Sequence, residues 1–208
     1  TGTTWAGAGS ITWTGGSTPS AGTLDMTGAG GTTMTVPDST KFFNLTCGDN
    51  SAGGIVTIVG TPYIYGTFTA DKYSPVRSGQ FGISGTVTPV VTNGATFENI
   101  QTFIYQSTQT ACATTYNILR PSAGSTVLLG GNTIATNLQT DSGTTVDSNG
   151  FDLKTKSIAN SSTIKHSKGS TLIFKQLAGS GIGTSTGDWE YIFLRWRFNI
   201  YYIFVGKA

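Results

Sequence analysis

The chain has 208 residues, of which 37% are hydrophobic, 11% are aromatic and only 11% are charged, and its net charge at pH 7 is +2. This apolar and aromatic content excludes a disordered chain, because disordered segments are poor in such residues. The near-neutral charge argues against nucleic acid as a partner, since phosphate binding needs a dense basic surface.

Residues 1–112 are predicted to form short strands separated by turns of small residues. Apolar and polar residues alternate, as is typical of strands, in GSITWTG (9–15), TTMTV (32–36), GIVTIVG (54–60), YIYGTFT (63–69) and ISGTVTPVV (83–91). Thr-x-Thr pairs recur at Thr12/Thr14, Thr33/Thr35, Thr67/Thr69, Thr86/Thr88 and Thr108/Thr110. Successive pairs are separated by similar intervals, except for a longer gap between Thr35 and Thr67. We interpret this half as a repetitive structure with longer loops.

Residues 113–175 contain a clearer repeat. Four columns keep nearly one register through three copies: Gly131, Gly150 and Gly169; Ile134, Leu153 and Leu172; Val127, Val146 and Ile164; and Leu119, Leu138 and Ile158. A period of about 19 residues is too short for a helix-pair repeat or a propeller blade, but it fits one coil of a β-solenoid.

The repeat predicts an all-β fold over residues 1–187, in which each strand pairs in parallel with the coils above and below it. The aliphatic columns, Ile134, Leu153 and Leu172 among them, are expected to stack inside, and the glycines to occupy corners with positive φ. Asn117 and Asn137 lie about one period apart, a spacing that favours a stacked asparagine ladder. Helix is expected to be scarce, because no long stretch free of glycine and proline has an apolar stripe.

The run NLQTDSGTTVDSNGFDLKTKSIANSSTIKHSKGSTLIF (137–174) resembles the coils of right-handed parallel β-helix proteins, such as phage tailspikes and fibres, autotransporter passengers and secreted adhesins. The resemblance implies a right-handed parallel β-helix displayed on a virion, on a cell surface or outside the cell, and a trimer is the natural state of such a fibre. The matching residues contain no family-specific catalytic motif, and a fold alone does not define a function.

The tail, DWEYIFLRWRFNIYYIFVGKA (188–208), has no serine or threonine and is rich in aromatic residues. As a strand it would be apolar on both faces, so we expect it to close the end of the solenoid or to form an oligomer contact. The contact residues would be Trp189, Tyr191, Phe193, Trp196 and Phe198. Glu190, Arg195 and Arg197 interrupt the tail, so it is not expected to span a membrane as a helix.

The sequence offers little for catalysis. Asp141, Asp147 and Asp152 fall within one coil, but two of them precede Ser-Gly and Ser-Asn-Gly, which are turn contexts. The only histidine, His166, lies between lysines, and there is no nucleophile elbow, C-x-x-C or calcium loop. We therefore expect no enzyme, no metal and no cofactor.

Two sets of residues are candidates for binding. Exposed aromatic rings stack on sugars, and the candidates for this role are Trp5, Trp13, Tyr63, Tyr65, Phe103 and Tyr105, with core filling as the alternative. Five lysines lie between Asp152 and Asp188 with no acidic residue among them: Lys154, Lys156, Lys165, Lys168 and Lys175. They predict a basic face for an anionic glycan or another acidic surface, and the alternative is that they keep the solenoid soluble.

Three further signals leave alternatives open. Cys47 and Cys112 form either a disulfide or two buried thiols. Asn44-Leu45-Thr46 and Asn160-Ser161-Ser162 match the glycosylation acceptor pattern, which is common by chance in such a chain. The chain begins at Thr1 with no visible signal peptide, so the N-terminus is either processed or trimmed.

The leading hypothesis is a rigid, non-enzymatic element outside a cell or on a virion, such as a fibre, spike, decoration protein or adhesin module, which forms a homotrimer or a larger assembly and has a glycan as its possible ligand. The first alternative is a glycan-degrading β-helix enzyme, which requires carboxylates clustered in a groove. The second is an ice-binding solenoid, which requires Thr-x-Thr pairs stacked once per coil.

Overall fold

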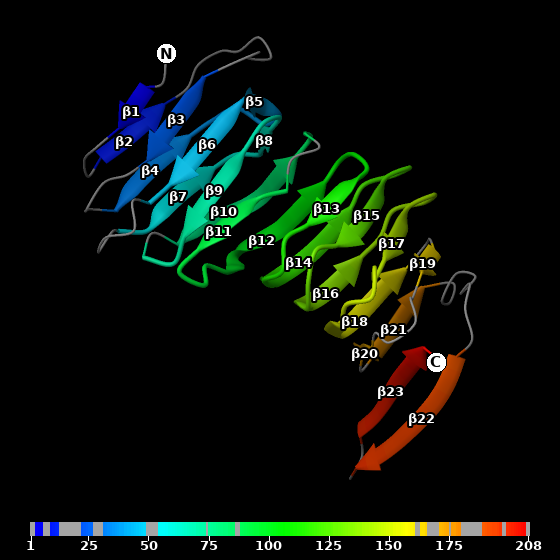
Figure 1. Cartoon of the computed structure of the whole chain (residues 1–208). Coiled ribbons are helices and arrows are strands. Elements are labelled where there is room, and N and C mark those ends of the chain that lie inside the picture. Colours follow the sequence, from blue (N-terminus) through cyan, green and yellow to red (C-terminus); the bar gives the residue numbers. More distant parts are fainter. Residues whose placement is uncertain are drawn as a thin grey trace. The chain divides into compact units, whose positions relative to one another are not determined.

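A computed structural model describes residues 3–5, 9–12, 22–26, 31–48, 54–73, 75–85, 88–160, 163–165, 171–174, 176–179, 189–196 and 199–206 (Figure 1). These residues contain strands, turns and bends but no helix. The chain divides into two compact units, Thr1–Ile104 (unit 1) and Tyr105–Ala208 (unit 2).

Unit 1 contains the strands β1 (Thr3–Trp5), β2 (Gly9–Thr12), β3 (Thr23–Met26), β4 (Thr32–Thr35), β5 (Thr40–Phe42), β6 (Asn44–Cys47), β7 (Val56–Val59), β8 (Pro62–Ile64), β9 (Phe68–Asp71), β10 (Val76–Ile83), β11 (Val90–Thr92) and, except for its last residue, β12 (Phe97–Tyr105). One sheet has the order β1-β3-β6-β9-β11, and its strands are parallel. A second runs β2-β4-β7-β10-β12, with β8 beside β10 and β5 beside β8.

Unit 2 contains the strands β13 (Gln109–Ala111), β14 (Thr115–Pro121), β15 (Thr126–Leu129), β16 (Thr133–Gln139), β17 (Thr145–Asp147), β18 (Leu153–Asn160), β19 (Thr163–Lys165), β20 (Thr171–Phe174), β21 (Gln176–Gly179), β22 (Trp189–Trp196) and β23 (Asn199–Gly206). The short sheet of unit 2 is β13-β15-β17-β19, and its long sheet includes β14-β16-β18-β20, with β21 also on β18. These pairs are all parallel.

Each strand in these sheets thus pairs with strands one coil away along the chain, and the coils are about 20 residues long. Alternate residues point inward and build the core, as in β4, where Thr32 and Met34 are buried and Thr33 and Thr35 are not. The predicted all-β parallel solenoid is confirmed. Its right-handedness and the division at residues 187 and 188 stay predictions.

Two of the predicted columns are confirmed. Leu119 pairs with Leu138 and Leu138 with Ile158, and all three side chains have no exposed surface. The column of Val127, Val146 and Ile164 is equally continuous, and each of its members is at most 2% exposed. Such stacking gives unit 2 an uninterrupted aliphatic interior, which is the main stabilising feature of a solenoid.

The predicted column of Ile134, Leu153 and Leu172 is wrong at its first member. Leu153 pairs with Leu172, but its partner in the preceding coil is Thr133. Ile134 is 49% exposed and lies opposite Lys154.

The cause is a difference in loop length. Val127 pairs with Val146 and Thr133 pairs with Leu153, so the segment from Val146 to Leu153 is longer by one residue than the segment from Val127 to Thr133. The extra residue lies in the turn Ser148–Phe151, whose Asn149 and Gly150 have φ angles of 51° and 85°. A slip of one residue moves a side chain to the other face of the sheet.

The asparagine ladder is also wrong. Ile118, rather than Asn117, lies opposite Asn137. The neighbour of Asn137 in the next coil is Ser157, whose hydroxyl donates a hydrogen bond to the Asn137 amide oxygen. Of the glycine column, Gly150 has the expected positive φ, whereas Gly131 is required by close packing, because a Cβ there would lie 2.5 Å from the Cβ of Ala113. Gly169 lies outside the described residues.

The interior of unit 1 contains a cluster of four phenylalanine rings. Phe68 lies 4.5 Å from Phe81 between ring centroids, and Phe97 lies 4.5 Å from Phe103. All four rings are completely buried. The cluster adds to aliphatic residues that also pair between coils, such as Met34 with Ile58 and Val56 with Val76.

Candidate functional site

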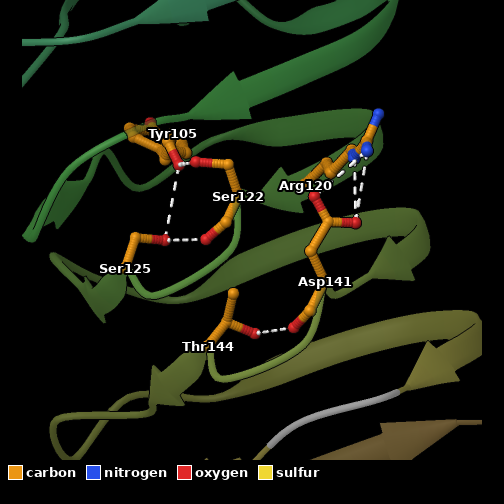
Figure 2. Close-up of polar contacts among 6 residues, drawn as sticks. All are labelled: Tyr105, Arg120, Ser122, Ser125, Asp141 and Thr144. Atoms are coloured by element: carbon orange, nitrogen blue, oxygen red, sulfur yellow. Dashed lines mark hydrogen bonds and ion pairs between the residues drawn. The ribbon is translucent and has the colours of Figure 1, made fainter.

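The carboxylates proposed for catalysis lie in separate parts of the coil. Asp141 follows β16, Asp147 ends β17 and Asp152 precedes β18. Asp141 forms an ion pair with Arg120, whose Nη2 lies 3.0 Å from Oδ2, and this pair joins two successive coils (Figure 2).

Asp147 and Asp152 also bridge coils. The Lys165 ammonium lies 2.9 Å from Asp147 Oδ2, and the backbone N–H of Asn149 donates to Asp147 Oδ1 at 2.8 Å. Asp152 Oδ1 accepts the backbone N–H of Thr171 at 2.7 Å. All three carboxylates therefore hold neighbouring coils or turns together.

Unit 1 has a comparable acidic residue in Asp71, which is 2% exposed. Its carboxylate accepts hydrogen bonds from Thr92 Oγ1 at 2.6 Å, Asn93 Nδ2 at 2.6 Å and the Tyr73 N–H at 2.8 Å. Burial raises the pKa of Asp71, but these bonds favour the ionised form more strongly, so the pKa lies below its ordinary value of 3.8. Asp71 thus joins two coils at a corner.

Corner turns in both units use the same hydrogen-bond pattern. Thr144 Oγ1 donates to the Asp141 carbonyl at 2.9 Å, and Ser125 Oγ donates to the Ser122 carbonyl at 2.6 Å (Figure 2). Thr40 Oγ1 donates to the Pro37 carbonyl at 2.7 Å.

In each of these turns the residue before the hydroxyl has positive φ: 66° at Ser39, 74° at Gly124 and 71° at Gly143. Ser122 and Ser125 also donate to the carbonyl of Tyr105, at 3.2 and 3.5 Å (Figure 2). A buried hydroxyl that follows a left-handed residue therefore closes the corner.

The aromatic candidates for glycan binding have different environments. Phe103 and Tyr105 are completely buried, so their proposed role as exposed platforms is wrong, and they fill the core instead. Tyr63 and Tyr65 are partly exposed. Tyr63 covers Gly82, where a Cβ would lie 2.1 Å from the tyrosine ring, and Lys41 Nζ lies 5.4 Å from the Tyr65 ring centroid.

The other two aromatic candidates are outside the described side chains. Trp5 belongs to β1 but its side chain is outside the described residues, as is all of Trp13.

The three predicted basic residues that the structure describes lie on two different sheets. Lys154 and Lys156 are both exposed on β18, in the long sheet of unit 2. Lys165 belongs to β19 in the short sheet, and its charge is paired with Asp147. Lys168 and Lys175 lie outside the described residues, as does His166.

The tail forms two strands. β23 is antiparallel to both β20 and β22, with Leu172 opposite Phe204 and Phe193 opposite Tyr202. The predicted contact residues Trp189, Tyr191, Phe193 and Trp196 lie on β22, their side chains are not among those described, and Phe198 lies outside the described residues.

The cysteines are free and buried, so the interpretation as two thiols is confirmed. Burial raises the pKa of both thiols, in Cys112 to about 11. No pattern in the sequence pointed to the polar cluster around Cys112, where the buried Tyr116 hydroxyl lies 2.9 Å from the Tyr105 hydroxyl and donates to the Cys112 carbonyl at 2.9 Å. Burial is the main reason why the pKa of each tyrosine is also raised.

Among the described residues, the Thr-x-Thr pairs do not stack once per coil as the ice-binding alternative requires. Thr12 lies opposite Thr35, and the next partner of Thr35 is Val59, which is 50% exposed. In the short sheet of unit 2, Thr126, Thr145 and Thr163 form a single column. The column two residues further along each strand contains Leu128, Asp147 and Lys165.

Other expectations concern ligands and modification. Among the described residues there is no group of three or more side chains suited to a metal ion, and no helix long and apolar enough to cross a membrane. Asn44 donates to Thr23 Oγ1 at 3.2 Å and accepts the Thr67 N–H at 2.7 Å, so its amide is part of a coil-to-coil contact. The side chain of Asn160 is not described. Comparison of the chain with protein-family models, curated proteins and solved structures finds no match.

Proposed function

We propose that this chain is a non-enzymatic structural or adhesive element, displayed outside a cell or on a virion, as a fibre, spike, decoration or adhesin module is. The observation that supports this most is that Asp71, Asp141, Asp147 and Asp152 all bond to neighbouring coils or turns. A glycosidase instead requires two carboxylates directed at one sugar bond.

The parallel strands supply the mechanical part of the proposal. Each coil is hydrogen-bonded to the coils on both sides along several strands, so one coil is not released without breaking both ladders. We expect the folded chain to resist proteases at neutral pH. Rapid cleavage within residues 105–165 under conditions where the chain is folded would contradict this expectation.

The non-enzymatic part is tested with a panel of neutral and acidic polysaccharides. Incubation with the chain is expected to release no new reducing or unsaturated ends. Cleavage that disappears in Asp141→Asn, Asp147→Asn or Asp152→Asn would overturn the proposal in favour of a glycan-degrading β-helix. Asp38→Asn, in an exposed turn of unit 1, is the matched control.

The oligomeric part is tested by light scattering of the full chain. A homotrimer of the 21.7 kDa chain is expected, because a trimer is common in fibrous assemblies. A monomer at high protein concentration would contradict it.

Ice binding is the alternative that depends on threonine. The column of Thr126, Thr145 and Thr163 is one residue wide, because Leu128, Asp147 and Lys165 flank it. We therefore expect no thermal hysteresis in a freezing assay, and measurable hysteresis that is lost in Thr145→Lys would favour the alternative.

A further inference from the structure

One outward surface of unit 2 combines positive charge with neutral polar groups. We call it the lysine face. It consists of the paired residues Thr115, Ile134 and Lys154 of β14, β16 and β18, together with the residues two positions further along each strand, Asn117, Thr136 and Lys156. Strands of neighbouring coils lie about 4.8 Å apart, and alternate residues on one strand are about 6.6 Å apart. The six side chains are thus regularly spaced neighbours.

Within the described residues the lysines of this face form no ion pair, and the nearby carboxylate of Asp152, two residues before Lys154, accepts the Thr171 N–H. The strands β14, β16, β18 and β20 contain no aspartate or glutamate. Arg120 and Lys165 in the same unit are neutralised by Asp141 and Asp147. Within the part of the chain that the structure describes, Lys154 and Lys156 have no ion pair, although both are exposed.

The neutral members of the face fit a sugar chain. Thr115, Asn117 and Thr136 carry hydroxyl or amide groups, which exchange hydrogen bonds with sugar hydroxyls. Ile134 is 49% exposed and offers an apolar surface to the C–H face of a sugar ring.

The small number of lysines on this face distinguishes between classes of acidic partner. Duplex nucleic acid carries one charge per ~1.7 Å and calls for dense basic contacts, and anionic membranes are bound by clusters of about 4–8 basic residues. The two lysines suit a polymer whose charges are sparse and separated by neutral hydroxyl groups. We propose that the lysine face binds a linear acidic polysaccharide, with Lys154 and Lys156 contacting its carboxylates or sulfates. This inference rests on the proposed adhesive function and names its ligand class.

The test measures binding of the full chain to polygalacturonate, with neutral dextran as the uncharged comparison, at low and high salt. We expect binding to polygalacturonate alone, weakened by salt. The double variant Lys154→Gln/Lys156→Gln should lose about tenfold or more in affinity. Its matched control, Lys72→Gln/Arg77→Gln, removes two exposed charges from unit 1 and should stay within about twofold of the unchanged chain.

A second pair of variants leaves both lysines in place. Ile134 lies opposite Lys154, so Ile134→Glu puts a carboxylate beside that ammonium and should weaken binding to polygalacturonate about as much as the double variant does. Ile134→Gln, which is neutral, should weaken it less. Because these positions are exposed, the circular dichroism spectrum should be unchanged in every variant.

Three results would overturn the inference: equal losses in the double variant and its control, undiminished binding in the double variant, or tighter lysine-dependent binding to duplex DNA or to anionic vesicles. Depolymerisation of polygalacturonate would refute the proposed non-enzymatic function while leaving lysine-dependent binding intact. The two failures are therefore distinguishable.

Discussion

The two units fill their interiors in different ways. In unit 1 the coil length varies: Thr32 pairs with Val56 and Val56 pairs with Val76, so the first of these two coils is the longer one. A cluster of four phenylalanine rings forms part of the core of this unit. In unit 2 the coils have nearly the same length, and each contributes an aliphatic residue to the same column. Coils of nearly constant length make the stacked residues visible as a period in the sequence, whereas coils of variable length keep the stacking of Val56 on Val76 but hide the period.

The largest expected effect is in the aromatic core. Phe103 contacts the rings of Phe68, Phe81 and Phe97, so Phe103→Ala should lower the free energy of unfolding by about 3–5 kcal/mol. Denaturant unfolding measures the loss, and Gln101→Ala, at an exposed position of the same strand, is the control. A loss below about 1 kcal/mol would show that the rings do not form a cooperative core.

The aliphatic columns should lose less per substitution. Leu138 lies between Leu119 and Ile158, and Leu138→Ala should cost about 2–4 kcal/mol. Hydrogen exchange should show faster opening in β14, β16 and β18 than in unit 1, because the coils on both sides lose contacts. Gln139→Ala on the same strand should change neither quantity appreciably, and unaltered exchange in Leu138→Ala would contradict the stacked column.

The sequence predicted the solenoid because the columns of unit 2 repeat with little interruption. It did not predict the position of Ile134, because the one-residue difference between the turn at Ser148–Phe151 and its counterpart is not visible as a change in composition. The prediction for two aromatic candidates was wrong for a related reason. Phe103 and Tyr105 lie on the same side of their strand, which suggested an exposed face, but all residues from Thr102 to Tyr105 are buried. The bonds of Asp141 and Asp71 depend on which coils are adjacent, and the sequence spacing alone does not specify the partner.

A smaller effect is expected at the corner of unit 1 that contains Asp71. Because the pKa of Asp71 is lowered in the folded state, its ionised carboxylate stabilises the fold fully at pH values above the ordinary pKa of 3.8. This stabilisation is lost as the pH falls through the lowered pKa. Asp71→Asn should therefore be less stable at neutral pH and lose less stability on acidification. Thermal unfolding over a pH series measures this, and parallel curves for both proteins would contradict it. Asp38→Asn is the control.

The smallest effects should come from the corner hydroxyls and should be equal in the two units. Thr144→Val and Thr40→Val each remove one hydrogen bond to a turn carbonyl, at a cost of about 1 kcal/mol. Thr35→Val, at an exposed strand position, is the control. A clear difference between Thr144→Val and Thr40→Val in melting temperature would mean that the shared turn geometry does not have a shared energetic role.

The reversal of direction at β23 has a consequence for growth of the structure. The last strand in a run of parallel coils has backbone N–H and C=O groups with no partner in its own sheet. A strand of another molecule can pair with these groups, which would join molecules end to end. At β20 these groups are paired with β23, which is antiparallel, so a parallel coil does not continue from this strand. The C-terminal hairpin therefore closes the edge of β20 to another parallel coil, while β22 and β19 become the last strands of their sheets.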